Sequence, residues 1–284
     1  MRLCLALTLL LWQTLVLADT SVWKVSKGEQ SLFIGGTLHI LAPSDYPLPD
    51  SFSTSYQQAQ TLVFETDLSA LSSPEFQLQM LTALTYPDGK NLKSVLEEDT
   101  YQRLNTYCQA RDLPLDNFLK FKPALLTITL TMIELQRMGI SSAGVDEHFY
   151  KQGTKDGKTL LKLETTEQQL QFLTSMGEGQ EDQLILSTLD DMDSLAKMMA
   201  TLKSAWRSGD SNKLLETAIM PISSDYPELY QNLLVSRNNS WLPQIEAMFK
   251  TPATEFILVG TLHLVGPDGI IERLQKSGYR VEQL

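Results

Sequence analysis

Gly36-Thr37-Leu38-His39 near the start of the chain and Gly260-Thr261-Leu262-His263 near its end are the same tetrapeptide. Each copy follows an apolar stretch that is typical of a buried strand. A glycine after such a strand allows the backbone to turn sharply, so each histidine is expected at the carboxyl end of its strand. Ligands bind at this edge of open α/β sheets. The repeat therefore predicts two strands, from opposite ends of the chain, that present two imidazoles to one site.

Between the two motifs, short apolar runs alternate with helical patterns. The predicted strands are residues 21–26, 31–35, 61–64, 159–163, 255–259 and 279–282. Residues 61–64 and 159–163 read as short buried strands, whereas 123–138 and 180–207 carry helical patterns. This order predicts an α/β class, with a mixed sheet formed by the N- and C-terminal halves and a largely helical middle region.

Composition limits the class of protein. The chain has 284 residues and a formal net charge of −11, from 34 acidic and 23 basic side chains. A nucleic-acid-binding protein is expected to carry a basic stripe, and the sequence has no such cluster. We therefore expect no nucleic-acid partner, and the charge favours a cationic substrate or a metal ion.

The first residues have the pattern of a secretory signal peptide. Met1-Arg2 is positively charged, Leu3–Leu17 is mostly apolar, and small residues end the run at Ala18. The run is shorter than the ~20 residues that a membrane-spanning helix needs. Residues 1–18 are therefore predicted to be removed, which leaves residues 19–284 as one domain, periplasmic or secreted and without stable membrane insertion.

The candidate site residues are few. Two of the three histidines, His39 and His263, lie in the repeated motif. Imidazole is a common metal ligand, and a hard divalent ion also needs oxygen ligands. Glu65 and Glu164 each follow a predicted buried strand, so both can reach the edge where the histidines lie.

Three other polar residues have more than one interpretation or no role in the site. Asp146 reads equally well as a helix N-cap. Arg237 is expected just after a helix, either facing a developing oxyanion or on the surface. His148 reads as a helix-face residue without a catalytic role.

Several motifs resemble the TraB/GumN family, which is related to the Tiki-type proteases. Their order and spacing carry the resemblance over nearly the whole mature chain. They are Phe33–His39, Tyr46–Pro49, Val63–Asp67, Tyr86–Gly89, Gly144–Asp146, Leu163–Thr165, Arg237-Asn238 and Val259–Leu264. The resemblance implies a paired Gly-x-x-His site with an acidic partner, and metal-dependent peptidase activity in the Tiki branch.

The leading hypothesis is an exported metal-dependent hydrolase that acts on a peptide or another small substrate. His39, His263 and Glu65 would bind a divalent ion (Mn, Co, Fe or Zn), which would activate water. Glu65 or Glu164 would serve as general base, and Arg237 would face the oxyanion. The alternative is a non-catalytic periplasmic binding protein for a peptide, haem or a metal.

Cleavage after Ala18 should leave Asp19 as the first residue of the exported protein, because small residues at this point form a signal-peptidase site. N-terminal sequencing of protein from the periplasmic fraction checks this. Protein that keeps Met1 and stays in the membrane fraction would contradict the predicted cleavage.

Overall fold

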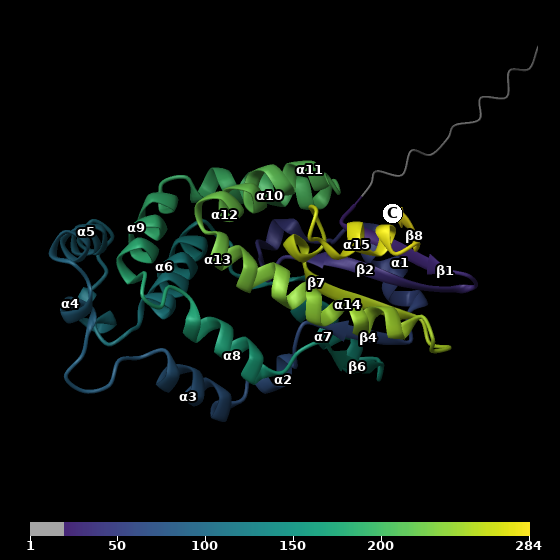
Figure 1. The fold of residues 1–284 in the computed structure, drawn as a ribbon, viewed down its shortest axis with the longest axis horizontal. Coiled ribbons are helices and arrows are strands. Elements are labelled where there is room, and N and C mark those ends of the chain that lie inside the picture. The colour runs from purple at the N-terminus through teal and green to yellow at the C-terminus, as the bar shows by residue number, and fades with distance from the viewer. Residues whose placement is uncertain (1–19) are drawn as a thin grey trace, which may run out of the picture.

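A computed structural model describes residues 20–284, so the predicted signal peptide and its cleavage site lie outside the described residues. The predicted α/β class is confirmed. A six-stranded mixed sheet has the order β6-β4-β7-β2-β1-β8 (Figure 1). Its strands are β1 (Val22–Lys27), β2 (Gln30–Thr37), β4 (Thr61–Phe64), β6 (Thr159–Lys162), β7 (Glu255–Gly260) and β8 (Arg280–Gln283). A separate two-stranded ladder pairs β3 (Ile40–Leu41) with β5 (Ser142–Ala143).

Four neighbouring strands of the main sheet are parallel. β2 pairs with β7, β7 with β4, and β4 with β6, so their carboxyl ends meet at one edge. The two repeated motifs therefore end adjacent strands, as the sequence predicts. In the register of β2 and β7, Thr37 pairs with Gly260 and Gly36 with Val259. The two copies of the motif are thus offset by one residue.

Helices surround the sheet and extend beyond it. Figure 1 shows α3 to α6 and α9 reaching away from the sheet on one side. Among residues 20–284, no helix is both long and apolar enough to cross a lipid bilayer. The α-helices are α1 (Asp50–Gln58), α2 (Leu68–Leu71), α3 (Pro74–Ala83), α4 (Leu92–Val95), α5 (Glu98–Gln109), α6 (Pro123–Arg137), α7 (Val145–Lys155), α8 (Thr166–Ser175), α9 (Glu181–Met192), α10 (Leu195–Arg207), α11 (Ser211–Leu214), α12 (Met220–Asp225), α13 (Pro227–Tyr230), α14 (Ser236–Met248) and α15 (Ile270–Lys276).

Two hydrophobic cores stabilise these layers. One lies on the sheet, where Phe52 of α1, Phe149 of α7 and Phe256 of β7 pack as an aromatic cluster. The other lies within the helical middle and is built by α4, α5, α6 and α9. The sheet core includes Phe64 and Val259 at the carboxyl ends of β4 and β7, so the backbone that leads into the following residues is held in place by packing.

Some details differ from the sequence-based expectations. β6 was expected to be buried, but it is an edge strand and Leu161 is 46% exposed, because it pairs only with β4. The helical stretch 180–207 breaks into α9 and α10. Gly260 has a φ of −48°, so the motif does not need a left-handed turn there. The motif glycines instead permit close approach: a Cβ on Gly36 would lie 2.6 Å from Oγ1 of Thr261.

Gly144, which follows β5, packs closely against the backbone of Leu38 and His39. Its φ of −76° suits any residue, but a Cβ there would lie 2.3 Å from the carbonyl carbon of His39. Gly144→Ala should therefore lower the free energy of unfolding by about 1–3 kcal/mol through overpacking alone. Urea denaturation measures this. The exposed Ser141→Ala is the control and should change stability by less than ~0.5 kcal/mol; equal effects of the two substitutions would refute the steric explanation.

Candidate functional site

The predicted site residues meet at the carboxyl edge of the parallel strands. Glu65 directly follows β4, and Glu164 follows β6 by two residues. His39 comes two residues after β2, and His263 ends a 3-10 turn (Thr261–His263, η5) that follows β7. Arg237 reaches the same place from the first turn of α14. Strand pairing thus brings together residues that lie near opposite ends of the chain, such as His39 and His263.

Arg237 is the centre of this group. Its Nη2 lies 2.5 Å from Oε2 of Glu65 and 2.7 Å from Oε1 of Glu164, and its Nε donates to Oε2 of Glu164 at 3.1 Å. The Nη1 group donates to Nε2 of His263 at 3.0 Å. The guanidinium fork therefore connects the ends of β4, β6 and β7. The sequence-based hypothesis has Arg237 facing a substrate oxyanion. In the structure, its Nε, Nη1 and Nη2 groups instead donate to Glu65, Glu164 and His263.

Helix geometry explains why Arg237 arrives there. The sequence predicts it just after a helix, but it lies in a continuous helical stretch, where the π-helical turn Gln231–Val235 (η4) leads directly into α14. A π turn adds a residue and rotates the side chains that follow it. Arg237 and its neighbour Asn238 consequently both reach the site.

Glu65 is 9% exposed and remains ionised. Burial disfavours its charged form, but the positive charge of Arg237 outweighs this cost, together with smaller contributions from the two motif imidazoles and from the Gly260 N–H that donates to Oε1 at 2.6 Å. The pKa of Glu65 is consequently lowered to about 2. A carboxylate with such a pKa is a weak proton acceptor and a suitable ligand for a cation.

Glu164 is covered more completely. It is 7% exposed, and besides Arg237 it accepts a hydrogen bond at 3.1 Å from the indole Nε1 of Trp241. The same indole ring lies under the guanidinium of Arg237 at 4.6 Å. Arg237 and Trp241 thus satisfy the Glu164 carboxylate together.

His263 is held as a neutral imidazole. The amide nitrogen of Asn238 donates to the backbone carbonyls of His263 and Asp268, at 3.1 and 2.9 Å. Oδ1 of Asn238 is therefore free to accept from Nδ1–H of His263 at 2.7 Å, which leaves the Nε2 lone pair for Arg237. Burial, opposed by Glu65 and assisted by Arg237, lowers the pKa of His263 to about 3.

His39 has a different environment. Its side chain is 64% exposed, whereas His263 as a whole residue is 4% exposed. Nδ1 lies 3.1 Å from Oδ2 of Asp146, and this carboxylate raises the pKa of His39 above its ordinary value. A carboxylate behind one ring nitrogen fixes the tautomer and increases the basicity of the other. No hydrogen bond from residues 20–284 occupies Nε2 of His39.

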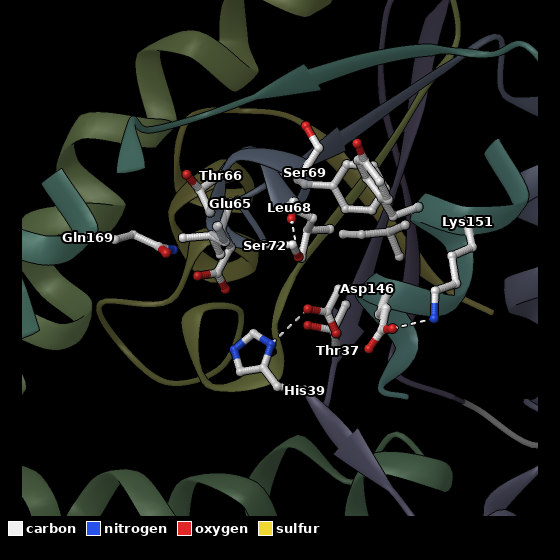
Figure 2. A pocket seen from close by; sticks show the side chains of 15 residues that line it. Thr37, His39, Glu65, Thr66, Leu68, Ser69, Ser72, Asp146, Lys151 and Gln169 are labelled. Atoms are coloured by element: carbon white, nitrogen blue, oxygen red, sulfur yellow. Dashed lines mark hydrogen bonds and ion pairs between the residues drawn. The ribbon is translucent and has the colours of Figure 1, made fainter. Parts of the chain in front are cut away.

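A pocket of about 690 Å³ opens beside these groups (Figure 2). Figure 2 shows the His39 ring with Asp146 beside it on one side and the Glu65 carboxylate pointing towards it from the other. A Cβ on Gly260 would lie 3.1 Å from Oε1 of Glu65 and 3.9 Å from Nε2 of His39. Oε1 of Glu65 and Nε2 of His39 therefore lie near the same position beside Gly260, and both residues line a pocket whose volume is in the range of ligand-binding pockets.

The donor atoms fit a divalent ion only in part. Nε2 of His39 and the Glu65 carboxylate face the same space, and three carboxylates (Glu65, Glu164 and Asp146) surround Arg237 and His39, which favours a cation. His263 fits as a third ligand only if Arg237 moves away, because the guanidinium uses its Nε2. Consistent with this, residues 20–284 contain no cluster of three or more His, Cys, Asp or Glu arranged around an ion.

Two partners of the motif histidines were not assigned from the sequence. Asp146 is not an N-cap, because Gly144 has that position and the Asp146 side chain turns to His39. Asn238 was noted only as part of a motif. Their positions depend on where α7 and α14 begin relative to the sheet, and their only sequence signal is that both lie in motifs of the family resemblance. His148 packs against Tyr46 and Phe149, outside the site.

Comparison of the sequence with known proteins gives the family of the chain. Over 87% of its length the chain is 22% identical to the uncharacterized protein YbaP of Escherichia coli, of which 89% is covered. It is also 22% identical to metalloprotease TIKI2 of Danio rerio over 88% of the chain and 58% of that protein. A shorter match to metalloprotease TIKI1 of Xenopus tropicalis has 32% identity over 32% of the chain and 17% of that protein. No solved structure matches. The family model for TraB/PrgY/gumN proteins matches residues 21–283, so the chain belongs to the TraB/PrgY/gumN family.

Proposed function

We propose that this protein is an exported, metal-dependent hydrolase of peptides whose reaction takes place between His39 and Glu65. The observation that carries the proposal is that Nε2 of His39 and the ionised Glu65 carboxylate lie near one another beside Gly260, in residues that line the same pocket. The relatives named as metalloproteases support a hydrolase, and the first 18 residues support export.

His39 and Glu65 would hold the ion. Bound there, a divalent ion would polarise a carbonyl group and lower the pKa of a water molecule. His39 is suited to this role because Asp146 supports its ring from Nδ1. Glu65 is suited because its lowered pKa keeps it charged at neutral pH.

Arg237 and Asn238 act as positioning residues in this proposal. Arg237 holds Glu65 and Glu164 in place, and Asn238 fixes the tautomer of His263, whose Nε2 in turn accepts from Arg237. If Arg237 moved away from His263, that imidazole would become available as a third ligand. Glu164 would then be the carboxylate that keeps Arg237 near the site.

Metal content and peptidase activity test the assignment together. Protein purified without chelators and supplied with Mn²⁺, Co²⁺, Fe²⁺ or Zn²⁺ should cleave members of a diverse peptide library. His39→Ala and Glu65→Gln should each lose bound metal and most of the activity, because the first removes the proposed nitrogen ligand and the second removes the negative charge of the proposed carboxylate ligand. His148→Gln is the control and should keep both properties, since His148 lies outside the pocket.

The outcomes separate the possible roles of the residues. A His263→Ala protein that keeps its metal would identify His263 as support for Arg237, and loss of metal would identify it as a third ligand. Wild-type protein that binds metal but cleaves no peptide would establish the binding-protein alternative. A His39→Ala protein with normal metal content and full activity would refute the proposed site.

Arg237 should also matter for stability. Arg237→Gln leaves Glu65 and Glu164 buried without their common cation, and loss of one partner of a buried ion pair costs about 3–5 kcal/mol. Urea denaturation should show this loss, and Arg237→Lys should restore part of it. The control is Arg103→Gln, which breaks an exposed pair with Asp190 and should cost less than ~1 kcal/mol. Equal costs for the two Gln variants would show that the Arg237 cluster does not stabilise the fold.

A further inference from the structure

Three polar atoms in the pocket beside His39 and Glu65 have no partner. Oγ1 of Thr37, Oγ1 of Thr66 and Oδ1 of Asp146 are buried, and none of them has a hydrogen-bond partner within the described chain. All three residues line this pocket, and Thr37 and Thr66 are only 2% and 4% exposed. Buried polar groups in folded proteins are nearly always hydrogen-bonded. These atoms are therefore available to a ligand that brings both N–H donors and a carbonyl acceptor.

The pocket also has an apolar wall. Leu68 and Leu71 come from α2, Tyr150 comes from α7, and Phe64 ends β4, with its ring 5.6 Å from that of Tyr150. Figure 2 shows Leu68 and Ser69 on the side of the pocket away from His39. Leu68, Leu71 and Tyr150 are partly exposed, so this surface can release water when a ligand covers it.

The charges near the apolar wall are already paired. Glu147 forms an ion pair with Lys151, one helical turn further along α7, and Asp146 pairs with His39. A charged ligand group would have to leave water at the apolar wall without a new counter-ion, which is costly. The wall therefore favours an uncharged guest.

We propose that the wall formed by Phe64, Leu68, Leu71 and Tyr150 holds an uncharged, apolar side chain of a peptide, while Thr37, Thr66 and Asp146 hydrogen-bond to the adjacent backbone amides. The hydroxyl groups donate to a peptide carbonyl, and Oδ1 of Asp146 accepts from a peptide N–H. This assignment rests on the proposed peptide hydrolase and names its substrate class: peptides with Leu- or Phe-like residues next to the reacting amide.

Binding without turnover tests the assignment. Blocked hexapeptides that differ only in a central Leu, Phe, Lys or Glu are titrated calorimetrically into the full chain with a chelator present. The Leu and Phe peptides should bind roughly 10- to 100-fold more tightly than the Lys and Glu peptides, which corresponds to the burial of one large apolar side chain. Leu71→Arg should remove most of this preference. Leu78→Arg, at a 65% exposed position on α3, is the matched control and should leave it unchanged.

The unpartnered hydroxyl groups give a second test. Thr37→Val and Thr66→Val replace a buried, unsatisfied hydroxyl by a methyl group of similar size, so the melting temperature should stay the same or rise. Affinity for the Leu peptide should nevertheless fall about 3- to 10-fold with each substitution. Ser55→Ala is the control, because Oγ of Ser55 is also buried without a partner but lies on α1, outside the pocket. It should leave the affinity unchanged.

The results distinguish this subsite from the proposed reaction. A Leu and Phe preference without cleavage by any metal-loaded protein would support the subsite and refute the hydrolase. Cleavage with equal binding of all four peptides would refute the subsite and leave the hydrolase in place. Val variants that bind the Leu peptide as wild type does would overturn the role of the hydroxyl groups.

Discussion

One guanidinium group holds the ends of three parallel strands together. Arg237 contacts Glu65 after β4, Glu164 after β6 and His263 after β7. Removing these charges from water costs several kcal/mol for each ion, and only close, multiple hydrogen bonds offset that cost. The Trp241 indole and the Gly260 N–H supply further bonds to the carboxylates. The position of α14 and the geometry of the sheet edge therefore depend on each other. Without α14 the two glutamates at the edge would lose their cation, and without the edge Arg237 would lose its carboxylates.

The repeated motif gives two chemically different histidines. β2 and β7 pair with an offset of one residue, so equivalent residues of the two copies point to opposite faces of the sheet. Thr37 consequently lines the pocket, whereas Thr261 lies against Gly36 on the other face. The ring partners differ as well, since His39 has the carboxylate of Asp146 and His263 has the neutral amide of Asn238. Identical sequence thus produces one exposed, basic imidazole and one buried, neutral imidazole.

The parts of the fold that depend on local pattern could be predicted from the sequence. Apolar runs identified the six strands of the main sheet but not β3 or β5, and the strand endings correctly placed Glu65 and Glu164 at the sheet edge. The burial of β6 was predicted wrongly, because an apolar run does not reveal whether a strand has one neighbour or two. The position of Arg237 within a helix depends on a π turn, which has no pattern of its own in the sequence. The pairing of Asp146 with His39 requires the β3–β5 ladder, a contact between segments a hundred residues apart.

Buried polar atoms without a hydrogen-bond partner lower the free energy of unfolding. Leaving a buried polar group unsatisfied costs about 1–3 kcal/mol, and an apolar residue of the same shape would avoid that cost. Ser55 and Thr261 have such hydroxyl groups outside the pocket, whereas the hydroxyl groups of Thr37 and Thr66 and a carboxylate oxygen of Asp146 belong to residues that line the same pocket as His39 and Glu65. Unsatisfied polar atoms in residues that line one pocket are typical of a surface that completes its hydrogen bonds with a ligand. The cluster around Arg237 supplies the rigidity that such a surface needs, since its side chains already satisfy one another and leave the pocket atoms as the ones free to bind.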